Sequence, residues 1–142
     1  MRTLGITLAI VSGILFAIHG WIVFAHPQYF EGFAIDRPMH VAGGAIVALF
    51  TGLAIFTERP LSPLRQLPWW ALALILISFT MLVGVMWELY EFGWDHFVAD
   101  RIGAIRAQPN IQDTMEDFLF DLMGGGVASI LFLWGVRSRP RV

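Results

Sequence analysis

Carboxylate side chains recur at helical spacing in the second half of this sequence, and they are the groups best suited to chemistry. Glu88, Glu91 and Asp95 are spaced i, i+3 and i+7, so a helix presents all three on one face. A second acidic set is spaced i, i+4 and i+8 and comprises Asp113, Asp117 and Asp121. The sequence therefore predicts two acidic helix faces, which could bind a cation or relay protons.

Histidines supply a second kind of ligand in the first half of the chain. Asp36 and His40 lie four residues apart, and His19 and His26 lie within and just after an apolar segment. If these segments and the two acidic ones are helices of one bundle, their ligand-type side chains point toward the same end of it. We expect the imidazoles to join the carboxylates there.

The depth of Glu88 and Asp121 makes them hard to explain as surface groups. At the helical rise, Glu88 lies about 10 Å inward of Asp95, and Asp121 lies about 12 Å inward of Asp113. A carboxylate below a membrane surface is destabilising unless it is paired, protonated or bound to a cation. Several carboxylates close together would not all ionise without positive charge among them. The arginines that could supply this charge are Arg37, Arg101 and Arg106.

A divalent-cation site is the interpretation that this combination favours. The predicted metal ligands are His40, Glu88, Glu91, Asp117 and Asp121. The predicted outer residues, which would orient ligands or attract cations, are Asp36, Asp95, Asp113 and His19. Oxygen ligands with one or two imidazoles suit magnesium, manganese, zinc or iron.

Several of these residues also have simpler structural interpretations. Asp95, Asp100 and Glu116 are typical of solvated helix ends, and Asp113 could cap the N-terminus of a helix. His19 could form a hydrogen bond with a neighbouring helix. These alternatives stay open for each residue taken singly.

Three functions are compatible with such a site. A bound divalent ion activates water, so a chain without cysteine or a G-x-S-x-G motif needs no side-chain nucleophile, and Glu91 is the candidate general base. A site at the outer membrane surface would meet an amphiphile, which makes metal-dependent hydrolysis of a lipid-linked phosphate the first hypothesis. A proton or cation transporter or relay is the second. A non-catalytic sensing or structural subunit is the third.

Long apolar segments must position these side chains. The sequence is 57% hydrophobic and 14% charged, whereas a soluble domain is about half apolar and a quarter charged. Its apolar residues form four blocks, each long enough for a helix across a hydrocarbon core of about 30 Å. The expected helices cover residues 4–25, 38–56, 69–95 and 113–136, with a loop over 97–110. We therefore expect an all-α, four-helix transmembrane bundle that forms a single integral membrane domain over residues 1–142.

The arginines predict the orientation of this bundle. Six of the nine fall at the termini and in the middle connection, namely Arg2, Arg59, Arg65, Arg137, Arg139 and Arg141. Basic residues in short loops stay in the cytoplasm, so we expect both termini inside and the loops over 26–37 and 96–112 outside. The first apolar block exceeds the roughly 7 to 15 residues of a signal-peptide core, so we expect it to be retained.

Three short motifs resemble a known family. They are Asp36 to His40 opening one helix, Glu88-Leu-Tyr-Glu91 closing the next, and Gln112-Asp113-Thr114-Met-Glu-Asp117 opening the last. Together they resemble the YjdF-like family of small bacterial proteins, which implies a multi-pass protein of the inner membrane. The stretch Asp117-Phe-Leu-Phe-Asp121-Leu-Met-Gly124-Gly125 is similar to the closing motif of VanZ-like proteins, which are associated with glycopeptide (teicoplanin) resistance. In those proteins an Asn commonly stands where this chain has Asp121.

The sequence also excludes several chemistries and partners. It has no cysteine, which excludes disulfides, thiolate metal sites and a cysteine nucleophile. It has no P-loop, no G-x-G-x-x-G motif and no basic patch with interleaved aromatics, so nucleic acid is not an expected partner. The expected partners are the lipid bilayer and an amphiphilic lipid phosphate, and an oligomer stays open. The arginines from 137 to 141 are expected to anchor the chain end to anionic lipid.

Overall fold

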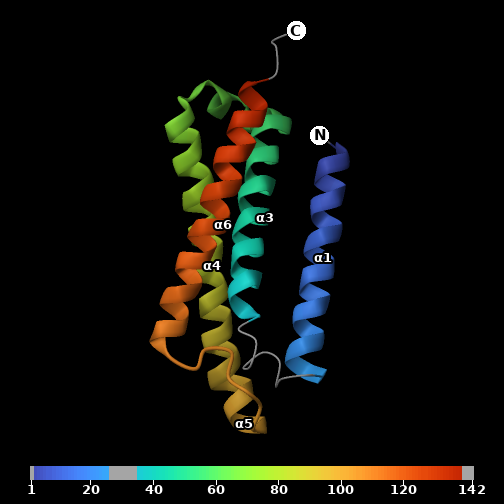
Figure 1. Ribbon diagram of the computed structural model, residues 1–142, viewed down its shortest axis with the longest axis vertical. Helices are drawn as coiled ribbons and strands as arrows, with labels where there is room; N and C mark the ends of the chain where they lie inside the picture. Colours follow the sequence, from blue (N-terminus) through green and yellow to red (C-terminus); the bar gives the residue numbers. More distant parts are fainter. Residues whose placement is uncertain (1, 26–34, 139–142) are drawn as a thin grey trace.

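The computed structural model describes residues 2–25 and 35–138, and all regular structure in that part of the chain is helical. Its four longest helices are α1 (Arg2–Ala25), α3 (Asp36–Thr57), α4 (Trp69–Trp94) and α6 (Ile111–Arg137). By length and composition, α3, α6 and the helical segment Trp69–Ile102 could each cross a membrane, and α1 contributes a shorter apolar stretch over Gly5–Trp21. Figure 1 shows α3, α4 and α6 packed together, with α1 standing beside α3.

Glycines let α3 and α6 approach each other closely. A Cβ atom at Gly44 would collide with the backbone oxygen of Asp121, and a Cβ atom at Gly124 would collide with the carbonyl oxygen of Val41. Small residues at a crossing allow such backbone contact in membrane helices. The two reciprocal contacts fix the register of α3 against α6 at the level of His40 and Asp121.

The apolar core lies at the end of the molecule away from those residues. Its buried members are Ile55, Leu72, Ala73, Leu76 and Leu133. A 3₁₀ helix, η1 (Arg59–Gln66), closes this end and packs Leu61 and Leu64 against the core. Arg65 caps the end of α3 by donating hydrogen bonds to the carbonyl oxygens of Ile55 (2.7 Å) and Glu58 (3.1 Å). The carbonyl oxygens at the end of α3 are thereby satisfied.

The helical region after α4 is longer than the sequence predicts. A loop was expected over 97–110, but α4 continues through a π-helical turn, η2 (Asp95–Ala99), into α5 (Asp100–Ile102) and ends at Gly103 with φ 66°. The prediction of a loop was based on the charged residues in this stretch. Two of them, Arg106 and Asp100, form an ion pair on the surface at 2.8 Å. The remaining loop is therefore short and folds back over the end of α4.

The first residue of α6 also differs from the expectation. Asp113 was predicted as the N-cap, and this prediction was wrong because Asn110 caps the helix instead. The Asn110 Oδ1 atom accepts hydrogen bonds from the backbone N–H groups of Gln112 (2.9 Å) and Asp113 (3.2 Å). The cap lies three residues earlier, so α6 is longer than expected at its start.

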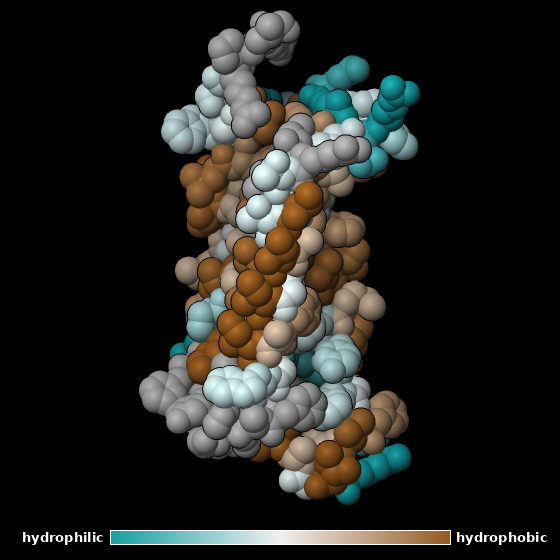
Figure 2. All heavy atoms as spheres, turned by 90° about the vertical axis from the view of Figure 1, so that its right-hand side faces the viewer, coloured by the Kyte–Doolittle hydropathy of each residue, from teal (hydrophilic) through white to brown (hydrophobic). Residues whose placement is uncertain are grey.

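The outward faces of the helices are strongly apolar. Large exposed side chains include Ile14 on α1, Phe79 on α4, and Ile130 and Trp134 on α6. Figure 2 shows a brown apolar surface along α1, with teal hydrophilic groups gathered near the ends of the molecule. A surface of this kind suits contact with lipid tails rather than with water.

Candidate metal centre

Five carboxylates and one imidazole gather at the end of the bundle opposite η1. They come in pairs from three helices and are Asp36 and His40 on α3, Glu88 and Glu91 on α4, and Asp117 and Asp121 on α6. All six are buried, and Asp117 and Glu91 expose only 1% and 2% of their surfaces. The spacing of three or four residues within each pair turns both members toward the centre of the bundle. We call this group the His40 cluster.

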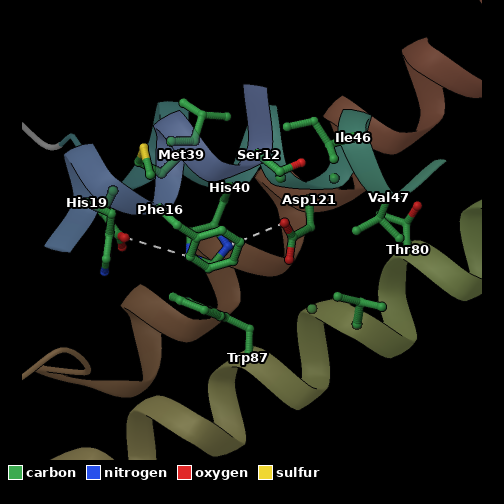
Figure 3. Close-up of a pocket in the computed structure, with 16 residues that line it drawn as sticks. Ser12, Phe16, His19, Met39, His40, Ile46, Val47, Thr80, Trp87 and Asp121 are labelled. Atoms are coloured by element: carbon green, nitrogen blue, oxygen red, sulfur yellow. Dashed lines mark ion pairs between the residues drawn. The ribbon is translucent and has the colours of Figure 1, made fainter. Parts of the chain in front are cut away.

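His40 lies at the middle of the cluster and uses its two ring nitrogens differently. Its Nε2 atom lies 3.7 Å from Asp36 Oδ1, 3.9 Å from Glu88 Oε1 and 3.8 Å from Asp117 Oδ1. Its Nδ1 atom faces the other way and lies 3.4 Å from Asp121 Oδ1, as the dashed line in Figure 3 shows. One nitrogen therefore faces three carboxylates, and the other faces a single one.

Every carboxylate of the cluster has a buried oxygen without a hydrogen-bond partner among the described residues. These atoms are Asp36 Oδ1, Glu88 Oε1, Glu91 Oε2, Asp117 Oδ2 and Asp121 Oδ2. Buried polar atoms of folded proteins are nearly always hydrogen-bonded or bound to an ion or water. Five unpaired oxygens in one place are therefore groups that a bound cation, water or added protons would satisfy.

Two overlapping sets of ligand atoms are close enough to hold a metal ion. One set is Asp36, His40 and Asp117, the other is His40, Glu88 and Glu91, and within each set the ligand atoms lie within 4.8 Å of one another. Atoms that bind one ion at about 2.0 to 2.6 Å must lie no more than about 5 Å apart. The geometry of both sets satisfies this limit.

The arginines that might have neutralised the cluster are engaged elsewhere or are exposed. Arg37 pairs with Glu116 at 2.6 Å and lies over the ring of Phe120, and Arg106 pairs with Asp100. Within residues 2–25 and 35–138, no arginine forms an ion pair with a carboxylate of the cluster. None of the arginines in this described part of the chain is therefore the counter-charge for these buried groups.

Two neighbouring residues that the sequence did not single out hold the glutamates in place. Gln108 donates hydrogen bonds from Nε2 to Glu88 Oε2 (2.5 Å) and to the Glu88 carbonyl oxygen (3.2 Å). Trp87 donates from Nε1 to Glu91 Oε1 (2.8 Å). Each glutamate thus has one oxygen fixed by a neutral donor and one oxygen left unpaired. Spacing could have suggested Trp87, four residues from Glu91, but nothing in the sequence marks Gln108.

The predicted outer residues occupy four different environments. Asp36 lies inside the cluster rather than around it. Asp95 is the first residue of η2, and its carboxylate accepts hydrogen bonds from the backbone N–H groups of the loop residues Ala107 (2.7 Å) and Gln108 (2.9 Å). Asp95 therefore positions the loop that carries Gln108.

The other two predicted outer residues lie farther from the centre. Asp113 is half-buried in the first turn of α6. His19, on α1, is also half-buried, and its ring meets the Trp87 ring edge-on with centroids 5.7 Å apart. His26 and most of the loop over 26–37 lie outside the described residues.

Comparison with known proteins gives a family but no characterised relative. The family described as predicted membrane protein (DUF2238) matches residues 2–139. The YjdF-like resemblance is consistent with this match, and the VanZ-like resemblance stays a prediction. No curated protein and no solved structure matches the chain. Because the match covers nearly all of the sequence, the chain belongs to the DUF2238 family of predicted membrane proteins.

Proposed function

We propose that this membrane protein binds a divalent metal ion in the His40 cluster and uses it on the extracytoplasmic side of the bilayer. The observation that supports the proposal is the set of five buried carboxylates, each with an unpaired oxygen, around a single imidazole. A buried group of like charges is strongly unfavourable unless a cation or protons neutralise it. A divalent ion neutralises two of the charges and binds several unpaired oxygens at once.

The geometry favours a division of roles within the cluster. Asp36 and Asp117 form one ligand set with His40, and Glu88 belongs to the other set but also faces the Nε2 atom of His40. We propose that a bound ion draws these three carboxylates together with Nε2 as its first ligands. A metal-bound histidine usually donates its other ring N–H group to a carboxylate, which fixes the orientation of the ring. Asp121, beside Nδ1, is in the position for that role. The proposal thus moves Asp36 inward and Asp121 outward relative to the sequence-based assignment.

Hydrolysis of a lipid-linked phosphate is the activity that this site would support. A divalent ion would supply Lewis-acid activation of water and of a phosphoryl oxygen. Glu91 Oε1 is held by Trp87, while Glu91 Oε2 is buried and unpaired, so Oε2 is the atom placed to accept a proton from water. The water oxygen would then bond to phosphorus and the phosphorus–oxygen bond to the lipid would break. The lipid oxygen would take up the proton that Glu91 removed from water and leave as the alcohol.

The polar groups on the other side of the cluster weigh against a proton or cation relay. Thr80 and Ser129 are buried in α4 and α6, and their hydroxyl groups donate to carbonyl oxygens of their own helices, at Leu76 (3.0 Å) and Gly125 (2.6 Å). Beyond them lies the apolar core around Ile55 and Leu72. A relay across the membrane needs ionisable or hydrated groups along its whole length.

Titration of the metal-free purified protein with Mn²⁺, followed by isothermal calorimetry, tests the site. We expect one tight site in the wild type. Glu88→Gln and Asp117→Asn should weaken it by more than the roughly 10- to 100-fold that loss of an outer partner costs. The matched controls, Glu116→Gln and Asp100→Asn, remove carboxylates that pair with arginines outside the cluster.

The controls should bind Mn²⁺ as the wild type does, and all variants should keep the wild-type circular dichroism spectrum. Absence of Mn²⁺, Mg²⁺, Zn²⁺ and Fe²⁺ binding by the wild type would refute the proposal. Equal binding by wild type and a folded Asp117→Asn variant would refute it as well. Phosphate release from phosphatidic acid or polyprenyl phosphate by the metal-loaded protein, lost in Glu88→Gln, tests the hydrolytic step.

A further inference from the structure

A cavity of about 150 Å³ lies between α1, α3 and α4 and reaches the His40 cluster. Asp36, His40 and Asp121 line its polar end, while Leu15, Ile46 and Val83 are among the apolar residues of its walls. In Figure 3 the labelled apolar side chains surround the space beside the His40 ring. The cavity therefore joins an acidic end to an apolar interior.

The interior of the cavity offers almost no hydrogen-bonding capacity. Ser12 and Thr80 line it, but the Ser12 hydroxyl donates to the Leu8 carbonyl oxygen at 2.8 Å and the Thr80 hydroxyl donates to the Leu76 carbonyl oxygen at 3.0 Å. The third polar lining residue outside the cluster is His19, whose ring packs edge-on against Trp87. A water molecule needs two to four polar partners to be stable in a cavity. Away from the cluster, the cavity thus suits hydrocarbon rather than water or an ion.

The cavity is elongated along the direction of the helices. Its lining on α3 extends from Asp36 to Val47, and the rise between these two residues is about 16 Å along the helix. Engineered apolar cavities of about 150 Å³ hold a single benzene-sized molecule. A space of this volume therefore accommodates a segment of one hydrocarbon chain and leaves no room for a second chain.

The wall formed by α1 lies toward the lipid-facing side of the molecule. Figure 1 shows α1 apart from the close group of α3, α4 and α6. Phe16 on α1 and Val83 on α4 line the cavity and are also exposed on the outer surface. A lipid chain could thus reach the cavity from the bilayer, between α1 and α4.

Trp87 links the apolar cavity to the proposed metal site. Its ring lines the cavity and contacts the ring of Phe16, with centroids 5.8 Å apart. Its Nε1 atom donates to Glu91. A chain in the cavity would therefore lie against the same side chain that holds the candidate general base.

We propose that this cavity binds the hydrocarbon tail of a single-chain lipid phosphate and directs its phosphate group toward the His40 cluster. The inference rests on the proposed metal site, because a phosphate would be repelled by the cluster carboxylates without a cation between them. The apolar walls pack against the hydrocarbon chain. The bound cation selects a lipid with an anionic head group. The shared chemistry of the ligand is a phosphate on one long alkyl or isoprenoid chain.

Photo-crosslinking of the Mn²⁺-loaded protein tests this assignment. The probe is a long-chain alkyl phosphate with a diazirine in its chain, supplied in phosphatidylcholine vesicles, and the crosslinked residues are mapped by mass spectrometry. We expect crosslinks on the cavity-lining faces of α1, α3 and α4. Excess unlabelled alkyl phosphate should remove them, whereas the corresponding alcohol should not. Competition by polyprenyl phosphate but not by lysophosphatidic acid, which has a single acyl chain, would identify an isoprenoid source, and the reverse would identify a phospholipid source.

A glycine in the cavity wall provides a selective variant. Gly43 lines the cavity, and a Cβ atom placed there meets no atom within 4 Å, so Gly43→Leu fills the space without striking backbone. Gly135→Leu is the matched control, because Gly135 is also open but lies at the far end of α6. Gly43→Leu should lose at least about nine-tenths of the cavity crosslinks and keep its Mn²⁺ affinity. Gly135→Leu should keep both.

The outcomes separate this inference from the metal site. A wild-type protein that binds Mn²⁺ but gives no crosslinks in the cavity, or gives the same crosslinks after Gly43→Leu, would overturn the lipid-chain assignment alone. Crosslinks that the alcohol removes as well as the phosphate does would overturn the role of the head group. A wild-type protein that binds no divalent metal would overturn the proposed function first.

Discussion

At the scale of single residues, His40 organises the site because its two nitrogens face different groups. Nε2 faces three carboxylates at 3.7 to 3.9 Å, and Nδ1 faces Asp121 at 3.4 Å. An imidazole that binds a cation through one nitrogen can donate a hydrogen bond only through the other. Asp117 and Asp121 are therefore expected to differ in role, although they stand four residues apart on the same helix.

Replacing these two aspartates in turn tests that difference. Asp121→Asn keeps an oxygen near His40 Nδ1, so we expect Mn²⁺ affinity to fall by about 10- to 100-fold while one ion still binds per chain. Asp117→Asn removes a charged first ligand and should cost more. Calorimetric titration of both variants measures the two affinities. Equal losses in the two variants would show that the assigned roles are wrong.

At the scale of helices, the sequence predicts most of the elements, because apolar length and helical spacing are local properties. The helix over 69–95 was expected where the structure has α4 over Trp69–Trp94, and the spacing of Glu88 and Glu91 correctly puts both on one buried face. The continuation through η2 and α5 was not predicted, since it depends on the pair between Asp100 and Arg106 and on the loop held by Asp95.

The cluster was predictable only in part for a related reason. Helical periodicity groups residues within one helix, but the register between helices decides which of them meet. That register depends on the contacts of Gly44 and Gly124, which place Asp36 inside the cluster instead of at its edge. Gln108 enters the site from a loop, where no periodicity exists to predict it.

The close approach of α3 and α6 gives a prediction at this scale. A Cβ atom at Gly44 would strike the Asp121 backbone, which cannot move as a side chain can, whereas a Cβ atom at Gly126 meets nothing within 4 Å. Gly44→Leu should therefore lower the unfolding free energy by at least about 1 to 3 kcal/mol, the usual cost of overpacking. Gly126→Leu should change it little. Denaturant unfolding in detergent micelles, followed by circular dichroism, compares the two, and equal stability would contradict the packing argument.

At the scale of the whole molecule, polar chemistry and apolar packing lie at opposite ends. The His40 cluster lies at one end, while η1, the Arg2 end of α1 and the Arg137 end of α6 lie at the other (Figure 1). This arrangement suits a protein whose site opens to one side of a membrane. The arginines at the opposite end favour a cytoplasmic location for that end. The four-crossing topology with both termini inside stays a prediction.

Single cysteines test that orientation directly, because the chain has no native cysteine. Ser62, on η1, and Ala104, in the loop before α6, are both exposed. In intact cells an impermeant thiol reagent should label Ala104→Cys and leave Ser62→Cys unlabelled until the membrane is opened. Labelling of Ser62→Cys but not Ala104→Cys from outside would reverse the orientation and place the His40 cluster on the cytoplasmic side.

The central claim is that one divalent ion binds His40 Nε2 together with carboxylate oxygens, and X-ray absorption spectroscopy of the Zn²⁺-loaded protein tests it most directly. We predict one imidazole nitrogen and two or more oxygens at about 2.0 to 2.2 Å from the ion. The multiple-scattering signal of the imidazole should disappear in His40→Gln. A spectrum with oxygen ligands alone in the wild type, or an imidazole signal that persists in His40→Gln, would contradict the account.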